Sequence, residues 1–383
     1  MLFKIFIILI ISFSFNQSLF NRALGEQQLF GDARSYSMGF THSVNATSSS
    51  LIRYNPSLIG FKTKGWSIDY QNNNSFIKER RSILVKDYFG DFLTYADYVN
   101  NDNSNHNMQF GIMGNITNNF SIAIAKLPYA SFNYNYIEEV RGSASVEDGD
   151  VGFKDPLVGY HVFNSKGQLN TFSIGFSLSD FLVDNSNYFN IGFGYHTVLK
   201  SEITDDIHAD SLTTDIQNLS SIEDYHNQQS FNNKLDAFYS FGASFKTKEF
   251  LFSFTYEPNS SIRKNIDDGY FNSETIDYFN NSGATFDTIG IFHYKPQRLS
   301  IGFSYHPITN RALIISGEYQ SNYILNHFNS SLKDYYIYKL GFEYMLPSSI
   351  PIRGGFIYQT SYYYLIPNQS ILTFGTGNNF NNI

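Results

Sequence analysis

The stretch Leu299-Ser-Ile-Gly-Phe-Ser-Tyr-His306 places an apolar or aromatic residue at every second position, with serine, glycine and histidine between them. Leu169–Leu178 and Phe189–His196 repeat this pattern. A period of two indicates a β-strand with one apolar and one polar face. Because such runs recur along the chain with no helical block between them, the sequence predicts a single all-β domain. Further runs lie at Trp66–Tyr70, Met108–Met113, Phe120–Lys126, Tyr239–Lys246, Phe250–Glu257, Leu313–Tyr319, Tyr338–Tyr344 and Ile352–Tyr358.

The composition favours a membrane protein over a soluble one. Of the 383 residues, 18% are aromatic and only 16% are charged, whereas soluble domains have about 25% charged residues. Few charges and many aromatics suit strands that face lipid on one side and water on the other. The net charge of −8 gives no electrostatic support for nucleic-acid binding. The absence of cysteine excludes disulfides, thiolate metal sites, a cysteine nucleophile and a lipoprotein anchor.

Two features of the strand runs point to an outer-membrane barrel. Phenylalanine, isoleucine and leucine occupy the middle of the runs, and tyrosine closes them. Tyrosine prefers the headgroup level of a bilayer. The polar face is rich in glycine and serine with occasional ions, which a barrel lumen tolerates. The closing tyrosines are Tyr70, Tyr195, Tyr256, Tyr305, Tyr319, Tyr344 and Tyr358, and the ions are Lys126, Lys246, Glu257, Glu318, Lys339, Glu343 and Arg353.

The connections after residue 235 alternate in length. Short turns are predicted near residues 247–248, 307–310 and 347–350, and long polar loops near 258–285, 322–334 and 361–368. Short turns at one rim and long loops at the other are the outer-membrane arrangement. This alternation requires Phe286–His306 to be one long strand bent at Pro296. Before residue 235 the alternation is not clean, and the strand register there is not assigned.

The segment Lys200–Asn233 is the longest insertion, and we interpret it as an extracellular loop that is partly helical. Its acidic residues raise the alternative of a Ca²⁺ site, but their spacing fits no EF-hand, and a solvated loop is favoured. They are Asp205, Asp206, Asp210, Asp215, Glu223 and Asp224.

The first 15 residues carry one positive charge followed by an apolar run. The run is shorter than the roughly 20 residues that a membrane-spanning helix needs. We therefore predict a secretory signal peptide over residues 1–18, with cleavage near Ser18 or after Gly25; an N-terminal anchor helix is the alternative. No later stretch is long and apolar enough for such a helix, so an exported chain of this kind crosses a membrane as a closed barrel.

Residues 23–60 differ from the rest, because glycine and proline punctuate a series of small residues, as in a compact folded loop. The pairs Ala33-Arg34, Met38-Gly39 and Asn55-Pro56 resemble the opening of the FadL/TodX-type family of outer-membrane transporters for hydrophobic compounds, and of its PorV-like relatives. The late runs near residues 300–307, 315–319, 340–344 and 373–377 resemble that family's last strands. The resemblance implies a hatch, residues 19–60, inside a barrel of about 14 strands formed by residues 61–383.

The chain departs from the family pattern in several places. Phe40 replaces a second glycine, residues 45–49 replace an acidic pair, and Ser57 replaces an alanine. The chain also ends at Ile383 without the aromatic terminal strand usual for such barrels. We expect either a truncated sequence or a different way of closing the barrel.

The resemblance assigns Arg34, Met38, Gly39, Asn55 and Pro56 to the structural motif of the hatch. Outside that context, Asn55-Pro56 is an ordinary turn before the first strand. Arg34 and Arg53 are candidates for binding a ligand carboxylate, but we favour pairing with acidic residues inside the barrel.

No catalytic residue, metal site or cofactor is predicted. The nine histidines show no zinc-site spacing, and the chain lacks a nucleophile elbow and a phosphate loop. An outer-membrane hydrolase is a minor alternative, in which a strand histidine pairs with a serine. The histidines considered are His161, His196, His293 and His306.

The function that the resemblance implies is passive uptake of hydrophobic small molecules, such as long-chain fatty acids or hydrocarbons, by a multi-pass barrel in contact with outer-membrane lipid and lipopolysaccharide. The alternative from another class is an interaction protein, a PorV-like partner of a secretion or surface-anchoring system. A protein partner that co-purifies with the barrel in place of an apolar ligand would favour that alternative.

Overall fold

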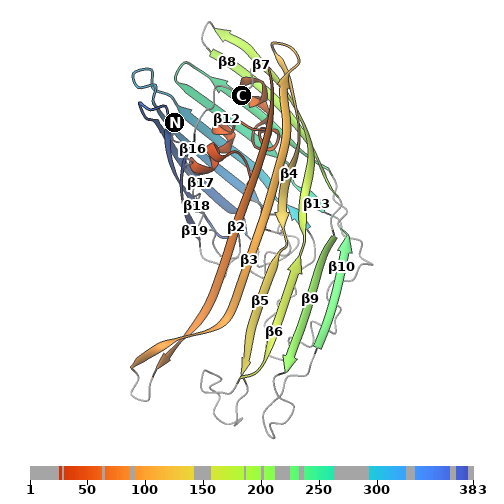
Figure 1. Cartoon of the computed structure of the whole chain (residues 1–383). Coiled ribbons are helices and arrows are strands. Elements are labelled where there is room, and N and C mark those ends of the chain that lie inside the picture. Colours follow the sequence, from red (N-terminus) through yellow and green to blue (C-terminus); the bar gives the residue numbers. More distant parts are fainter. Residues whose placement is uncertain are drawn as a thin grey trace, which may run out of the picture.

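The computed structural model describes residues 26–27, 30–62, 65–86, 91–141, 157–184, 187–199, 202–211, 225–232, 237–262, 293–324, 333–362 and 368–377. The predicted signal peptide, residues 1–18, lies outside these ranges. The described chain is mostly β, with a large antiparallel sheet of 12 strands and a small helical segment inside its curve (Figure 1). The predicted all-β fold class is confirmed. The resemblance implied about 14 strands, two more than this sheet has.

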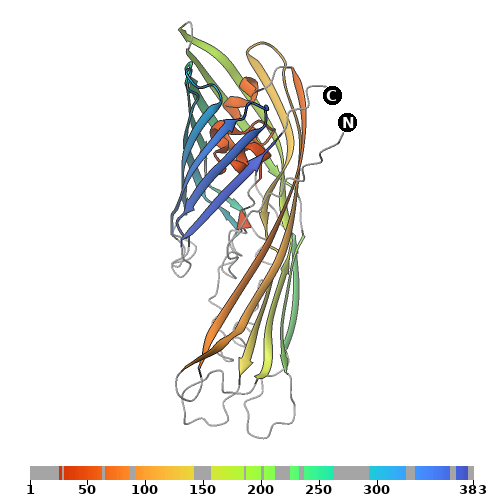
Figure 2. The ribbon, with the colours of Figure 1, turned by 60° about the vertical axis from the view of Figure 1, so that its left-hand side comes forward.

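The sheet is a continuous antiparallel ladder that runs from β2 to β19 in the order β2-β3-β4-β7-β8-β11-β12-β15-β16-β17-β18-β19. These strands are β2 (Trp66–Lys86), β3 (Phe92–Asn115), β4 (Phe120–Ser131), β7 (Gln168–Asp184), β8 (Asn187–Val198), β11 (Phe238–Lys246), β12 (Phe250–Glu257), β15 (Gln297–Tyr305), β16 (Leu313–Tyr323), β17 (Tyr335–Met345), β18 (Pro351–Gln359) and β19 (Gln369–Thr376). Figure 2 shows the ladder from a second side.

Short turns join neighbouring strands at one end of the sheet, which we call the turn end. The predicted turns at residues 247–248, 307–310 and 347–350 lie there, between β11 and β12, β15 and β16, and β17 and β18. We call the opposite end the loop end. Of the long loops predicted there, residues 263–285, 325–332 and 363–367 lie outside the described residues.

Several strands of the ladder are interrupted near the loop end, and the chain continues beyond the interruption as a separately numbered strand. The continuing strands are β5 (Tyr134–Arg141), β6 (Leu157–Lys166), β9 (Glu202–Ser211), β10 (Tyr225–Asn232), β13 (Ser260–Ile262) and β14 (His293–Lys295). The predicted long strand Phe286–His306 is interrupted at Pro296, which separates β14 from β15; β14 pairs with β13 in a small separate sheet, and residues 286–292 lie outside the described residues. With the far ends of β2 and β3, strands β5, β6, β9 and β10 form an extension that we call the distal sheet (lower half of Figure 1).

The interpretation of Lys200–Asn233 as a partly helical loop is wrong for residues 202–211 and 225–232, which are strands β9 and β10. Both strands carry polar residues on both faces, so no apolar alternation marks them in the sequence. Residues 212–224 lie outside the described residues.

The two faces of the sheet differ as the alternation predicts. On β15, Ile301 and Phe303 are exposed on the outer face, whereas Ser300, Gly302 and Ser304 are buried. A row of tyrosines crosses neighbouring strands on the outer face, since Tyr338 pairs in register with Tyr319 and with Tyr358. Such an aromatic row above an apolar band is typical of an outer-membrane barrel. No helix in the described part of the chain could cross a membrane by its length and apolar character.

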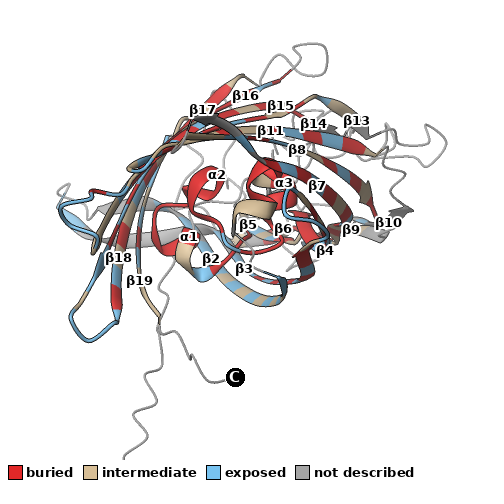
Figure 3. Ribbon diagram, turned by 90° about the horizontal axis from the view of Figure 1, so that it is seen from above, coloured by how far each residue is buried: buried red, intermediate tan, exposed pale blue. Residues whose placement is uncertain are grey.

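Residues 30–62 form a compact segment inside the curl of the sheet, which we call the hatch (Figure 3). It consists of short helical turns, most of whose residues are buried: α1 (Ala33–Ser37), α2 (His42–Asn45), α3 (Leu51–Tyr54), η2 (Pro56–Leu58) and α4 (Ile59–Lys62). Asp32 caps the first turn by accepting a hydrogen bond from the Ser35 N–H at 2.8 Å, an arrangement that stabilises a helix start.

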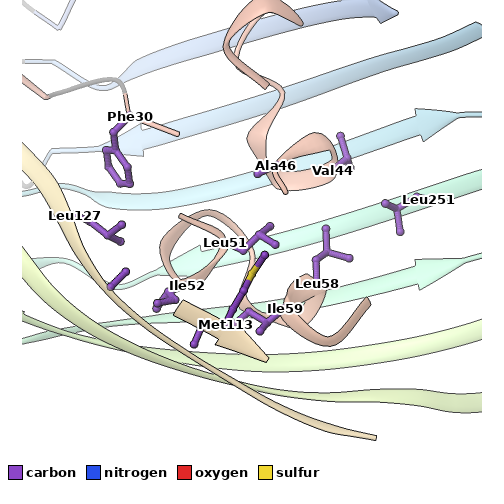
Figure 4. Packing of buried hydrophobic residues seen from close by; sticks show 12 residues of the cluster. Phe30, Val44, Ala46, Leu51, Ile52, Leu58, Ile59, Met113, Leu127 and Leu251 are labelled. Atoms are coloured by element: carbon purple, nitrogen blue, oxygen red, sulfur yellow. The ribbon is translucent and has the colours of Figure 1, made fainter. Parts of the chain in front are cut away.

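The strands around the hatch form what we call the wall. The largest buried apolar cluster of the described residues joins the hatch to this wall (Figure 4). Leu51, Ile52 and Ile59 from the hatch pack with Met113 and Leu127 from β3 and β4. Burying such side chains stabilises each by roughly 1.5–3 kcal/mol. The hatch is therefore part of the core and not a loose insert.

The β3–β4 pair separates partway along its length. The two strands pair at residues 110–115 with 121–126, and on this side of β3 the next pairing described is with β5, through residues 99–101. Where they part, the short strand β1 (Glu26–Gln27) pairs with Ala130 and Ser131. The Ser131 hydroxyl also donates to Asn105 Oδ1 at 2.7 Å, so side chains bridge this part of the wall.

Candidate functional site at the hatch

Carboxylates on four wall strands hold the hatch. Glu343 on β17 accepts two hydrogen bonds from Arg34, at 3.0 and 3.1 Å. Glu318 on β16 accepts from the Ser43 N–H at 2.9 Å and from its hydroxyl at 2.7 Å. Charged hydrogen bonds of this kind are stronger than neutral ones, so these two contacts attach α1 and α2 to the wall.

The other two carboxylates attach the second half of the hatch. Asp69 on β2 accepts from the Ser49 N–H at 2.8 Å and from the Ser49 hydroxyl at 2.9 Å. Glu257 on β12 accepts from Arg53 Nε at 3.1 Å. The hatch is thus tied to strands on opposite parts of the ladder and spans the interior of the sheet.

Wall glycines form the seat on which the hatch rests. A Cβ added at Gly355 would lie 2.0 Å from the Gly39 nitrogen, and one at Gly341 would lie 2.3 Å from the Met38 carbonyl oxygen. Gly192 meets the backbone of Pro56 and Ser57 in the same way. Gly39 itself has φ of +65°, a left-handed conformation that glycine adopts without strain. The close approach explains why the inner face is so rich in glycine.

The Asn55-Pro56 turn is built as a local cap. Asn55 Oδ1 accepts hydrogen bonds from the Ser57 N–H and hydroxyl, at 3.3 and 2.6 Å, and its Nδ2 donates to the Ser43 carbonyl at 2.9 Å. Pro56 begins the 3-10 turn η2. The side chain of Asn55 therefore joins two helical turns of the hatch, which is an architectural role.

Both arginines singled out from the sequence pair with acidic residues of the wall. Arg34 contacts Glu343 and Arg53 contacts Glu257. Met38 is fully buried against the seat, and Gly39 donates its N–H to the Thr373 hydroxyl at 3.0 Å. The five hatch-motif residues thus lie at contacts with the wall or within the hatch itself.

A cluster of cations surrounds Glu257 at the loop end of the hatch. Lys295 Nζ lies 3.1 Å from its carboxylate, Arg53 Nε also lies 3.1 Å away, and Arg298 forms the closest pair with it. Arg298 also donates to the Arg53 carbonyl at 2.8 Å. All of these side chains are almost completely buried. We call Glu257, Arg53, Lys295 and Arg298 the cation cluster.

The charges of the cation cluster do not balance, since three cations share one carboxylate. Buried charges are costly unless they are paired and hydrogen-bonded. Arg298 Nε has no hydrogen-bond partner among the described residues. The cluster is therefore short of negative charge in the described part of the chain and still presents a free donor.

Aromatic rings enclose the cation cluster. The Arg53 guanidinium lies over the ring of Tyr129 at 4.8 Å and over Phe238 at 5.6 Å. Arg298 lies over the ring of Tyr54 at 5.2 Å. These distances are within the range of cation–π attraction. Tyr129 and Phe238 also belong to a buried apolar cluster with Phe132, Leu169 and Val198. Positive charge and apolar surface thus lie side by side.

Two members of this cluster, Lys295 and Arg298, were not predicted from the sequence. Lys295 and Arg298 stand on either side of Pro296 and interrupt the apolar alternation, so we read that stretch as a bend. The one feature that could have indicated them is a pair of cations next to a proline in a strand whose polar face is predicted to line the lumen.

The strand histidine His196 is held by hydrogen bonds at both of its ring nitrogens. His196 Nδ1 lies 2.8 Å from the Ser173 hydroxyl, and its Nε2 lies 3.0 Å from the Ser240 hydroxyl. Ser240 donates in turn to the Ile52 carbonyl of the hatch at 2.7 Å. Since that proton is used there, Nε2 of His196 donates to Ser240 and Nδ1 accepts from Ser173. His196 is completely buried between wall and hatch, so this serine–histidine pair anchors the hatch.

The other histidines considered for hydrolysis are dispersed. His161 is buried on β6, with Nδ1 4.0 Å from Glu138. His306 is exposed at the turn end, next to the Ser304 hydroxyl at 2.9 Å. His293 begins β14. His161 and His293 lie on different strands, and His306 follows the end of β15.

The fold of the chain is similar to that of two solved structures. The chain is similar to a Pseudomonas aeruginosa FadL homologue, with a TM-score of 0.57, 11% identity, and coverage of 94% of this chain and 88% of the other. It is also similar to the Ralstonia pickettii toluene transporter TbuX, with a TM-score of 0.50, 11% identity, and coverage of 94% and 99%. No family model and no curated protein sequence match the chain. At this identity the likenesses establish a FadL-type β-barrel fold.

Proposed function

We propose that this FadL-type barrel carries an apolar molecule with an anionic end passively across the outer membrane, with the hatch as its gate. The observation that supports this most directly is the cation cluster, where three buried cations share the carboxylate of Glu257. The transport of toluene by the similar TbuX supports the apolar part of the proposal, and the charge imbalance supports the anionic end.

A carboxylate of the cargo would supply the missing negative charge. It can accept a hydrogen bond from Arg298 Nε, which has no partner among the described residues. The rings of Tyr129 and Phe238 are buried beside the cluster, and the adjoining hydrocarbon would pack against them. Pockets for such ligands combine mostly apolar walls with a few placed polar groups.

The same cluster connects the cargo to the gate. Arg53 belongs to helix α3 of the hatch, whereas Lys295 and Arg298 belong to the wall. A cargo carboxylate that binds Arg53 competes with Glu257 and weakens one of the four carboxylate contacts that hold the hatch. Binding energy at the cluster would thereby be used to shift the hatch, since a ligand moves an equilibrium only through its differential affinity for the two states.

The direct test is binding of dodecanoate and of dodecanol to the full-length protein in detergent, measured by calorimetry. The two ligands share a chain length and differ in charge. We expect dodecanoate to bind more tightly, and Arg298→Gln to weaken it about tenfold or more, since hydrogen bonds to charged groups contribute roughly 1.5–3 kcal/mol. Dodecanol binding should be unchanged by that substitution.

The matched control is Lys126→Gln, because Lys126 is exposed on the outer face of β4, where the prediction that it lies on the lumen face was wrong. It removes a strand cation without touching the cluster and should leave dodecanoate binding as it is. Equal affinity of dodecanoate and dodecanol would refute the anionic end. Binding of neither, together with unchanged uptake of apolar compounds by cells that lack the gene, would refute transport.

A further inference from the structure

The distal sheet carries a second group of ionisable side chains, far from the hatch. On β9, Asp206, His208 and Asp210 are spaced two residues apart and therefore lie on one face. His226 of β10 is the register partner of His208. The two imidazole rings meet edge-on, with centroids 5.9 Å apart. Two histidines and two carboxylates thus occupy neighbouring positions on one surface.

The donor atoms of this group lie around one carboxylate oxygen. His226 Nε2 lies 2.9 Å from Asp206 Oδ1, and His208 Nδ1 lies 3.7 Å from the same oxygen. Nitrogen and oxygen ligands lie about 2.0–2.2 Å from a tetrahedral metal ion, so neighbouring donors are roughly 3.3 Å apart. The two observed separations lie on either side of that value.

The other nitrogen of His208 is also oriented. Its Nε2 lies 3.5 Å from Asp210 Oδ2. Histidines that bind a metal usually donate their second N–H to a carboxylate, which fixes the ring and its tautomer. The Nδ1 atom of His208 faces Asp206, which can bind the same metal ion. Its Nε2 atom faces Asp210, which can orient the imidazole ring.

We propose that Asp206, His208 and His226 bind a divalent transition-metal ion, with Asp210 as the positioning residue for His208. In the described part of the chain no three such side chains have already converged as a metal site. A short rotation of the half-exposed side chains is therefore part of binding. Imidazole donors favour zinc, copper or nickel over calcium. The ion would join β9 to β10.

Metal binding is tested with the full-length protein in detergent. Competition of Zn²⁺ with a chelating dye measures affinity, and the electron paramagnetic resonance spectrum of added Cu²⁺ reports how many imidazole nitrogens bind. We expect a site with two nitrogens in the wild type. His208→Gln and His226→Gln should each remove one nitrogen, and Asp206→Asn should lower Zn²⁺ affinity at least tenfold.

Asp210→Asn should lower the affinity about 10–100-fold without changing the number of bound nitrogens, as expected for a partner that only orients a ligand. The control is His106→Gln, since His106 is an exposed histidine of β3 that contacts Asn74. It should leave both readouts unchanged. A wild-type Cu²⁺ spectrum with fewer than two nitrogens would overturn the proposal, as would a loss of affinity in the control equal to that in Asp206→Asn. The wild-type spectrum decides even where a variant fails to fold.

Discussion

Replacing Glu257 by glutamine should destabilise the barrel strongly. Glutamine keeps the size of the side chain and removes its charge, which leaves Arg53, Lys295 and Arg298 buried without an anion. Removing one partner of a buried ion pair costs about 3–5 kcal/mol, because an uncompensated buried charge remains. The lower figure corresponds to a roughly 150-fold shift of the unfolding equilibrium.

The chain carries its own probe for this measurement. Trp66 is the single tryptophan, and it lies exposed on the outer face of β2, where its fluorescence reports loss of the lipid environment. Urea unfolding in phospholipid vesicles, followed at this residue, gives the free energy of unfolding for each variant. The same experiment with dodecanoate present should stabilise Glu257→Gln more than the wild type.

The control is Asp102→Asn, which removes the carboxylate of an exposed pair with Lys78 at 3.7 Å. Exposed pairs contribute roughly 0–1 kcal/mol. The double variant Glu257→Gln/Arg298→Gln separates charge from packing and should be more stable than Glu257→Gln alone. If Glu257→Gln costs no more than Asp102→Asn, the charges of the cluster are not isolated from water, and the reasoning on the anionic cargo fails with them.

Two further substitutions test the hatch. Gly355→Val should displace the hatch, because a Cβ there would lie 2.0 Å from the Gly39 nitrogen. We expect its ion conductance in planar bilayers to exceed that of Ser370→Val, a control at an exposed strand position. Equal conductance of the two variants would contradict a hatch that rests on Gly355. Burial lowers the pKa of His42 below its ordinary value of 6.5, so the unfolded chain binds more protons. Stability should therefore fall below about pH 6.5, by at most about 1.4 kcal/mol per pH unit from this group; His42→Leu should flatten this dependence in urea unfolding, and an unchanged slope would show that other groups cause it.

The strands of the second half of the chain could be predicted closely. Phe250–Glu257 is β12 residue for residue, and the run Leu313–Tyr319 lies within β16. These strands face lipid on one side and the hatch on the other, so their alternation is strong. The distal strands β9 and β10 were missed because polar residues occupy both of their faces. Alternation shows a strand only where its two sides meet different surroundings.

The candidate site could be predicted in part. Arg34 and Arg53 were expected to pair with acids inside the barrel, and they do so with Glu343 and Glu257. The identity of those acids depends on strand register, which one sequence does not determine across a long ladder. Lys295 and Arg298 come together with Arg53 only because β15 and the hatch meet in space, more than 200 residues apart along the chain.

The glycines of the inner face distinguish a plugged barrel from an open pore. In an open pore a small side chain at these positions would meet water, and nothing would select against a Cβ. Here a Cβ at Gly192, Gly242, Gly341 or Gly355 would lie 2.0–2.4 Å from atoms of the hatch. The positions of glycine in the strands therefore reflect close contact with the hatch. A glycine-rich inner face opposite an Asn-Pro turn is evidence for a seated hatch, and the pattern can be sought in other barrels without a structure.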